Sequence, residues 1–251
     1  MSGHRGTIVF PVAVGPFLVI TMNVAIIAAA GQGTRMAGKR PKQFLELAGT
    51  PILFHTLKAF EECDLIHETI VVIPAQESAG FLALAGKYGM RKLAKVVAGG
   101  KTRAESVLKG LQAIREATAE VVAVHDGVRP FVTPDEISRT VAAAREQGAA
   151  ILVSKPVDTI KEVEDGKVVK TLKRDHLRNA LTPQCFHYKL LRRAYEQVDV
   201  NDPDLTDESS LVERLGVPIA IVEGSARNIK ITREEDLAIA EQLLRELKSK
   251  R

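Results

Sequence analysis

Residues 23–44 read NVAIIAAAGQGTRMAGKRPKQF, an apolar run followed by a glycine-rich, basic segment. Small and branched apolar residues fill positions 24–30, a composition typical of a buried strand in a parallel sheet. Gly31 and Gly33 follow this run, and glycine permits both positive φ angles and the close approach of a ligand to the backbone. The stretch therefore predicts a first strand that leads directly into a binding loop.

Beyond the glycines lies a group of cationic side chains with no acidic residue among them: Arg35, Lys39, Arg40 and Lys42. A solvated basic surface usually carries interspersed acids. Backbone N–H groups and unneutralised cations together suit a chain of phosphates. We therefore interpret this segment as a nucleoside triphosphate site, with a tight turn beside a solvated basic face as the alternative.

Two common phosphate-binding patterns do not match this segment. Met36 occupies the position where the dinucleotide-binding fingerprint has its third glycine, and no Gly-Lys-Ser/Thr follows as a P-loop requires. The prediction of a triphosphate site therefore rests on the glycines and the cations together.

The whole chain has the composition of an ordinary globular protein, with 251 residues, 45% of them hydrophobic and 26% charged. This length allows one α/β domain with a sizeable core, or two small ones. A net charge of +4 and an aromatic content of 4% argue against nucleic-acid binding, which favours strongly basic surfaces with stacking platforms. The mild positive charge suits a small anionic substrate.

Residues 1–22 resemble a short signal peptide, but Pro11 and Pro16 interrupt the apolar run and no small-residue cleavage site follows. The run is also too short to span a bilayer. We therefore expect an N-terminal extension outside the fold, a single domain over residues 23–251, and no membrane association. Cys63 and Cys185 belong to no Cys-x-x-Cys pattern, which argues against a disulfide or a zinc site and favours a reducing, cytoplasmic location.

Strand-like and helix-like segments alternate along the rest of the chain. The apolar patterns predict strands at residues 24–30, 69–73, 95–98, 121–124, 150–153 and 219–222. They predict helices at residues 52–61, 77–88, 135–147, 188–198 and 233–247. This alternation predicts an α/β fold with a Rossmann-like, mostly parallel sheet and helices on both faces. In such sheets the ligand lies beyond the carboxyl ends of the strands.

A different pattern occupies residues 158–172, where two alternating segments flank the turn Glu164-Asp165-Gly166. This pattern indicates a β-hairpin. Few of its side chains could join the main core, and a hairpin that exposes alternating Val, Ile and Leu needs a partner. We therefore expect a protruding hairpin arm at about residues 157–182.

Asp126 directly follows the strand expected at residues 121–124. An Asp at the carboxyl end of a parallel strand, on the same edge as the basic loop, could hold Mg²⁺ or another divalent cation against triphosphate oxygens. An Asp that only shapes a turn or caps a helix is the alternative. We interpret the preceding His125 as structural.

A series of motifs resembles the sugar-phosphate cytidylyltransferases, and most of all the group that acts on 2-C-methyl-D-erythritol 4-phosphate. The motifs are AAGQGTRM at 29–36, PKQF at 41–44, GGKTRAESV at 99–107, HDGVRP at 125–130, TPQCF at 182–186, TDESS at 206–210 and NIKIT at 228–232. The resemblance covers the chain from about Asn23 to the C-terminal helix. It implies transfer of the cytidylyl group of CTP to 2-C-methyl-D-erythritol 4-phosphate, a step of the non-mevalonate isoprenoid pathway. It also implies Mg²⁺ as the cofactor and a homodimer clasped through the hairpin arm.

The resemblance further implies roles for individual residues. It implies catalytic roles for Arg35, Lys42, Arg174 and Lys230, with Arg174 supplied by the neighbouring subunit. It implies nucleotide binding by Ala29, Ala30, Gly31, Gly33, Gly100, Lys101, Ser106, Asp126 and Gly127, with the metal at Asp126. It implies substrate binding by Arg129, Thr159, Thr182 and Thr206.

The chain departs from the family pattern at two places. Lys101 stands where relatives often have an acid, so the resemblance carries over only a backbone contact there, and Gly127-Val128 replaces a pair of alanines. From the residues alone, Arg174 would be an ordinary solvated charge and Thr206 a helix N-cap.

Two alternative functions remain open at the level of sequence. One is a D-ribitol 5-phosphate cytidylyltransferase, a group built on the same plan that tends to read Ala-Gly-Gly at the first loop and to lack Thr-Asp-x-x-Ser. The other is a non-catalytic protein that retained the nucleotide-binding fold, because a fold does not by itself specify an activity.

Overall fold

The computed structural model describes residues 21–202 and 204–249, except for residues 32–40. Most of the expected N-terminal extension, residues 1–20, therefore lies outside the described residues. So do two predicted site residues, Gly33 and Arg35.

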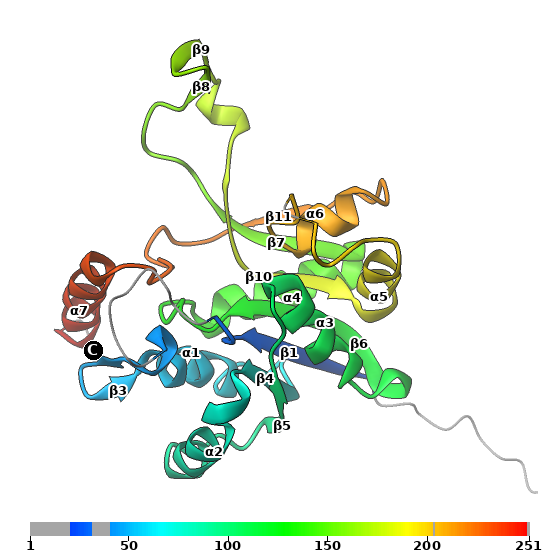
Figure 1. Ribbon diagram of the computed structural model, residues 1–251, viewed down its shortest axis with the longest axis vertical. Helices are drawn as coiled ribbons and strands as arrows, with labels where there is room; N and C mark the ends of the chain where they lie inside the picture. The colour runs from blue at the N-terminus through cyan, green and yellow to red at the C-terminus, as the bar shows by residue number, and fades with distance from the viewer. Residues whose placement is uncertain (1–20, 32–40, 203, 250–251) are drawn as a thin grey trace, which may run out of the picture.

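A seven-stranded sheet forms the centre of the molecule, in the order β11-β7-β10-β6-β1-β4-β5 (Figure 1). The strands are β1 Met22–Ala28, β4 Glu68–Ile73, β5 Leu93–Ala98, β6 Ala119–Asp126, β7 Ala149–Ser154, β10 Asn179–His187 and β11 Ala220–Glu223. β1 pairs in parallel with β4 and β6, β4 with β5, and β7 with β11, whereas β10 runs antiparallel to both β6 and β7. The expected mostly parallel α/β sheet is confirmed.

Helices cover both faces of this sheet, because alternate residues of each central strand point to opposite faces. In β1, Ala25 and Ile27 pack in a cluster with α1, α2 and α4, whereas Val24 and Ile26 pack with α3, α5 and α6. The helices are α1 Ile52–Glu61, α2 Ser78–Lys87, α3 Arg103–Gln112, α4 Pro134–Gln147, α5 Tyr188–Glu196, α6 Glu208–Glu213 and α7 Glu234–Ser249. The strand is therefore apolar on both sides, as its sequence predicts.

The C-terminal helix α7 packs outside these two clusters. Ala240 of α7 joins a small third cluster with Leu47, Ile52, Val128 and Ile231. Leu47 belongs to the short pair of β2 Glu46–Leu47 and β3 Thr50–Pro51. This cluster brings the segment before α7 against the carboxyl edge of the sheet, where β6 ends.

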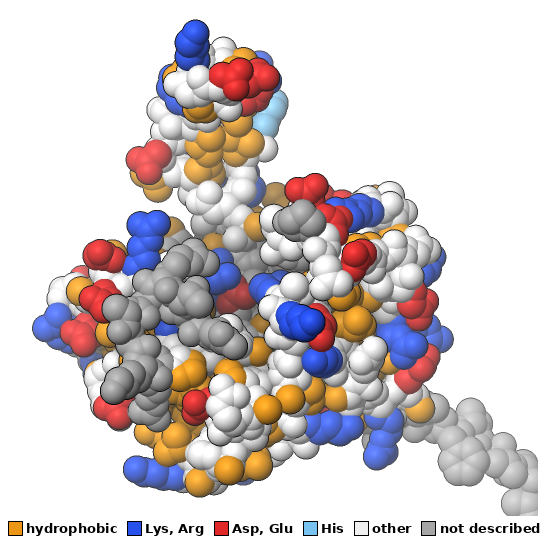
Figure 2. Space-filling model, in the orientation of Figure 1, with side chains coloured by type: hydrophobic (Ala, Val, Ile, Leu, Met, Phe, Trp, Pro, Cys, Tyr) orange, Lys and Arg blue, Asp and Glu red, His pale blue; other side chains and the backbone are white. Residues whose placement is uncertain are grey.

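The expected hairpin arm is formed by β8 Lys161–Glu164 and β9 Lys167–Thr171, which pair only with each other among the described strands. Every residue of both strands is exposed. The arm projects from the body at the top of Figure 1, and Figure 2 shows hydrophobic side chains along it. Val163, Val168 and Val169 are each more than half exposed, at 57%, 61% and 52%.

Two expected features, the end of the first strand and the cap of α6, differ from the structure. The first strand ends at Ala28 instead of residue 30, and the backbone N–H of Ala29 then donates to the carbonyl of Val72. Thr206 was expected to cap the helix α6, but the N-cap is Asp207, whose carboxylate accepts from the Ser210 N–H.

The strand β10 was not expected, because Pro183 in its middle argues against a central strand. The structure accommodates Pro183 at an irregularity, where the register with β7 shifts between Ala180 and Gln184. The ladder therefore does not require the N–H that proline lacks.

Candidate nucleotide and phosphate site

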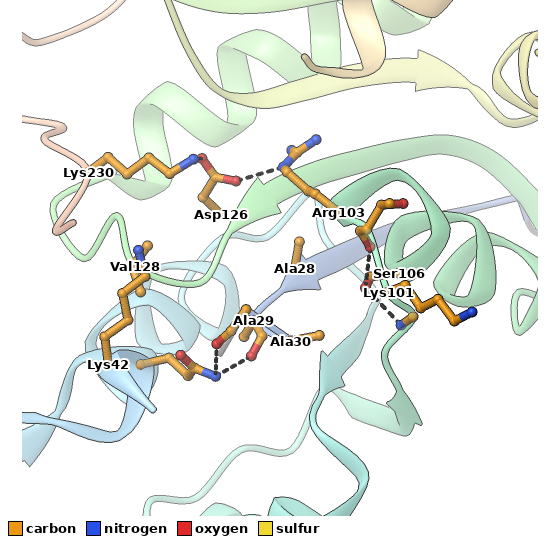
Figure 3. A pocket seen from close by; sticks show the side chains of 14 residues that line it. Ala28, Ala29, Ala30, Lys42, Lys101, Arg103, Ser106, Asp126, Val128 and Lys230 are labelled. Atoms are coloured by element: carbon orange, nitrogen blue, oxygen red, sulfur yellow. Dashed lines mark hydrogen bonds and ion pairs between the residues drawn. The ribbon is translucent and has the colours of Figure 1, made fainter. Parts of the chain in front are cut away.

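A cavity of about 550 Å³ opens at the carboxyl edge of the parallel strands (Figure 3). Residues from five separate stretches of the chain meet there: Ala28, Ala29, Ala30, Gly31, Lys42, Gln43, Gly100, Lys101, Thr102, Arg103, Ser106, Asp126, Val128 and Lys230. Parallel strands bring their carboxyl ends to one edge, which explains why segments distant in sequence meet. Of the predicted site residues, Ala29, Ala30, Gly31, Lys42, Gly100, Lys101, Ser106, Asp126 and Lys230 line this cavity.

The first loop is held in shape by Gln43. The side-chain amide of Gln43 donates to the carbonyl of Ala29 at 2.6 Å and to that of Gly31 at 3.2 Å. Gln43 is 1% exposed, so these bonds lie in a region of low dielectric where they are strengthened. The sequence predicted the loop and Lys42, but it gave no role to Gln43.

The second loop, between β5 and α3, is also braced internally. The Gly100 N–H donates to the hydroxyl of Ser106 at 2.9 Å, and this hydroxyl donates to the carbonyl of Thr102 at 2.9 Å. Thr102 is the N-cap of α3 and accepts from the Glu105 N–H. A Cβ on Gly99 would lie 2.1 Å from the Cβ of Ala30, so only glycine lets the two loops approach each other this closely.

Asp126, at the end of β6, is surrounded by cations. Its carboxylate accepts from Arg103 Nε at 3.1 Å, from Arg129 Nε at 3.2 Å and from Lys230 Nζ at 3.0 Å. Burial would raise the pKa of Asp126, but the three cations hold that pKa well below its usual range. Asp126 is therefore ionised at all pH values at which the protein would work.

Arg103, like Gln43, is a residue of this site that the sequence did not single out. It begins α3 and bridges two acids, donating through Nε to Asp126 and through Nη1 to both oxygens of Glu208, at 2.8 and 2.9 Å. Burial alone would lower the pKa of Arg103, but Glu208 and Asp126 raise it above its usual value. Arg103 belongs to the motif GGKTRAESV, but the sequence does not indicate that it pairs with Glu208, which lies 105 residues further along the chain.

His125 lies behind the cavity and is fully buried. Its Nε2 is 3.2 Å from the carbonyl of Arg129 and its Nδ1 is 2.9 Å from the hydroxyl of Thr182. Burial lowers the pKa of His125 to about 3, so the ring is neutral and Nε2–H donates to the carbonyl. The Thr182 hydroxyl donates to Nδ1 and accepts from the Asp126 N–H at 3.2 Å.

The remaining predicted residues lie outside the cavity in this chain. Thr182 is 4% exposed behind Asp126, and Gly127 and Arg129 lie beyond the end of β6. Arg129 donates through Nη1 to the carbonyl of Asn228. Thr206 directly precedes the Asp207 cap.

Thr159 and Arg174 belong to the arm rather than to the body of the molecule. Arg174 lines a second cavity of about 490 Å³ at the base of the arm, with Lys155, Pro156, Val157, Asp175 and Arg178. Its Nη1 donates to the carbonyl of Val157. A single chain therefore does not bring these two residues to the first cavity.

The donor set for a divalent cation is small. The described part of the chain contains no cluster of three or more His, Cys, Asp or Glu side chains that could hold a metal. Among the described residues that line the first cavity, Asp126 is the one that supplies an ionised carboxylate. This fits Mg²⁺ that arrives with a triphosphate, because Mg²⁺ is commonly bound by one or two carboxylates together with substrate phosphates.

The α/β fold, the two braced loops and the cation-rich cavity at the strand ends fit a nucleotidyltransferase, which must bind the phosphates of a nucleotide. A family model described as 2-C-methyl-D-erythritol 4-phosphate cytidylyltransferase matches residues 23–246. The chain belongs to this family, as expected from its motifs.

Individual relatives are similar over nearly their whole lengths. The 2-C-methyl-D-erythritol 4-phosphate cytidylyltransferase of Syntrophus aciditrophicus is 43% identical, covering 88% of this chain and 95% of the relative. That of Geobacter metallireducens is 44% identical, with 88% and 97% covered. The crystal structure of 4-diphosphocytidyl-2C-methyl-D-erythritol synthase from Anaerococcus prevotii superimposes with a TM-score of 0.80 at 34% identity, covering 90% of this chain and 96% of that one.

None of the helices in the described residues is both long and apolar enough to cross a membrane. Cys63 and Cys185 are buried free thiols.

Proposed function

We propose that the protein transfers the cytidylyl group of CTP to 2-C-methyl-D-erythritol 4-phosphate. An oxygen of the substrate phosphate attacks the α-phosphorus of CTP. The bond from that phosphorus to the β-phosphate oxygen breaks, and pyrophosphate leaves as 4-diphosphocytidyl-2-C-methyl-D-erythritol forms. One observation carries this proposal. Lys42, Arg103 and Lys230 line the same cavity as the ionised Asp126, next to the loops at residues 29–31 and 100–106.

Repulsion between two anions is the main obstacle to this reaction. The substrate phosphate is already ionised at neutral pH, so it needs no general base, and catalysis depends on positioning and charge neutralisation. The buried His125 supports this account, because both of its ring nitrogens are engaged away from the cavity.

Each part of the cavity has a role in this proposal. The loop at Ala29–Gly31 and the loop at Gly100–Ser106 would hold the nucleotide, with backbone groups reading the cytosine ring. Lys42, and Arg35 outside the described residues, would stabilise charge on the α-phosphate and the departing pyrophosphate. Mg²⁺ bound by Asp126 would neutralise phosphate charge when present.

Lys230 is positioned at the cavity by its ion pair with Asp126 and would bind the incoming phosphate. Its ammonium group lies 3.0 Å from Asp126, and its side chain is 39% exposed, so it can turn from the carboxylate toward a substrate phosphate. The backbone on either side is fixed, because the Ile231 N–H donates to the carbonyl of Val128 and Asn228 is fully buried. Thr182 and Arg129 would shape the substrate side through their hydrogen bonds with Asp126. Thr206, directly before the Asp207 cap, would contribute to the same side.

We further propose a homodimer joined through the arm, with Thr159 and Arg174 serving the neighbouring subunit's site. The exposed valines of β8 and β9 support a partner for the arm, because hydrophobic side chains on a free hairpin are otherwise left in water. Arg174 lies at the base of the arm and outside the first cavity, which supports action on another chain. A cytoplasmic location stays a prediction, as do a single domain over residues 23–251 and an extension before it.

A panel of substrates tests the proposed function. We expect pyrophosphate release from CTP and Mg²⁺ with 2-C-methyl-D-erythritol 4-phosphate, and far slower release with D-ribitol 5-phosphate or with ATP, GTP and UTP. Faster turnover of D-ribitol 5-phosphate would assign the other cytidylyltransferase activity. CTP binding without release from any sugar phosphate would assign a non-catalytic role.

A further inference from the structure

Glu208 is a buried acid next to the proposed site, within the TDESS segment at residues 206–210. It is 1% exposed at the start of α6. Arg103 donates to both of its oxygens, and the Tyr195 hydroxyl donates to Oε1 at 3.1 Å. A carboxylate is removed from water only at a large cost unless it is paired and hydrogen-bonded, and Glu208 meets both conditions.

Arg103 is shared between Glu208 and the cavity carboxylate. Its Nη1 faces Glu208 while its Nε faces Asp126. The connected cluster thus contains three cations, Arg103, Arg129 and Lys230, and two carboxylates, Asp126 and Glu208. Glu208 neutralises one positive charge that would otherwise act on the cavity alone.

This charge balance matters because the cavity must accept both a polyanion and a cation. An additional positive charge favours metal-free CTP over its magnesium complex, because chelation removes two negative charges from the nucleotide. The same charge opposes a divalent cation at Asp126, which already faces three cations. Added positive charge next to Asp126 therefore raises the affinity for metal-free CTP and lowers the affinity for the divalent cation.

We propose that Glu208 is a positioning residue that, by binding Arg103, sets the net charge next to Asp126. It thereby sets the relative affinity of the cavity for the metal-free triphosphate and for its complex with a divalent cation. This inference rests on the proposed function. The alternative is that Glu208 only packs α6 against α3 and α5. Tyr195 separates the two accounts, because it bonds the same carboxylate oxygen but carries no charge at neutral pH.

The test compares CTP binding to the full-length protein by calorimetry, once in EDTA and once in saturating Mg²⁺. Glu208→Gln keeps the size of the side chain and removes its charge. We expect the Kd in Mg²⁺ divided by the Kd in EDTA to rise on the order of tenfold in this variant, because Arg103 then carries an unneutralised charge beside the cavity. Tyr195→Phe should leave the ratio unchanged, and Glu208→Asp should restore it.

A second pair of variants keeps the test decisive if Glu208→Gln does not fold. Arg103→Gln removes one cation from the cluster and should shift the ratio in the opposite direction, toward the magnesium complex. Arg103→Gln/Glu208→Gln removes one charge of each sign and should return the ratio to that of the wild type.

The outcomes that overturn the inference differ from those that overturn the proposed function. A ratio that is the same in Glu208→Gln, Arg103→Gln and the wild type would show that the charge of Glu208 plays no part. A parallel loss of both affinities together with the melting temperature would show that Glu208 is only structural. Absence of CTP binding by the wild type under both conditions would instead overturn the proposed function.

Discussion

Single side chains in the cavity act mainly through their charge. Asp126 binds three cations and is held ionised by them, whereas the neighbouring His125 is buried and neutral. Adjacent residues of one strand thus have opposite electrostatic roles, because alternate positions of a strand face different surroundings. Two predictions follow from these charges.

The first prediction concerns the lysines of the cavity. Replacement of Lys42 or Lys230 by alanine should lower kcat by roughly a hundred- to a thousandfold, since loss of one contact to developing charge costs about 2.7–4 kcal/mol in a related setting. Arg35→Ala should have a similar effect. Steady-state kinetics with CTP and the sugar phosphate measure this, and Lys58→Ala, a change on the exposed face of α1, is the control. Near-normal turnover in the Lys42 and Arg35 variants would remove their catalytic assignment.

The second prediction concerns pH and His125. The pKa of His125 is about 3 in the folded protein and about 6.5 in the unfolded chain, so below pH 6.5 protons bind preferentially to the unfolded chain. The stability that depends on the neutral ring is thus fully present above pH 6.5 and decreases as the pH falls toward 3.

This loss should amount to about 1.36 kcal/mol per pH unit from this one group. Urea unfolding at pH 7.0, 6.0, 5.0 and 4.5 measures it. His125→Gln removes the titrating ring, and its free energy of unfolding should depend less on pH over this range. An equal pH dependence in the variant and the wild type would contradict the assignment.

At the scale of elements, helix starts hold the loops of the site. Thr102 caps α3 and accepts from the Glu105 N–H, and its carbonyl accepts from Ser106 in the nucleotide loop. Thr133 caps α4 in a reciprocal capping box with Glu136. The two caps are chemically alike, but only Thr102 lines the cavity.

The third prediction uses these caps as a matched pair. Thr102→Ala and Thr133→Ala should each lower the free energy of unfolding by about 1 kcal/mol, the usual effect of losing a Thr cap. Only Thr102→Ala should also raise the KM for CTP, because its loop is proposed to bind the nucleotide. Denaturant unfolding and initial rates measure the two effects. Equal KM values in both variants would argue against nucleotide binding by this loop.

At the scale of the whole molecule, some of the predicted catalytic residues lie in the body and one lies at the base of the arm. Lys42 and Lys230 line the first cavity, whereas Arg174 lines the second cavity beside the arm. A site shared between two subunits would require one chain to supply the lysines and the other to supply Arg174.

The fourth prediction tests this sharing by mixing inactive subunits. Heterodimers of Arg174→Ala and Lys42→Ala chains should regain activity, because one of their two sites would have both residues intact. Heterodimers of Lys42→Ala and Lys230→Ala chains are the control and should stay inactive, since both lysines line the cavity of the same chain. Differently tagged, co-purified heterodimers and an activity assay measure this. No recovery in verified Arg174→Ala/Lys42→Ala heterodimers would contradict action across the interface.

Much of the fold was predictable because local patterns carry it. The runs at residues 69–73 and 121–124 are apolar on both sides and form central strands, and the alternation around Glu164-Asp165-Gly166 forms the arm. β10 was not predictable, because Pro183 normally excludes a central strand and only the local irregularity of register admits it. The N-cap at Asp207 was also missed, because Thr206 and Asp207 are both good capping residues.

The sequence by itself determined the strand-and-helix alternation, the glycine loop, the cations near it and Asp126, because these are short-range patterns of residue type. Only the tertiary structure decided that Arg103 bridges Asp126 and Glu208, that Gln43 braces the first loop, and that His125 is neutral. These features depend on which distant side chains come within bonding distance and how far each is removed from water. Neither quantity is set by the neighbours of a residue along the chain.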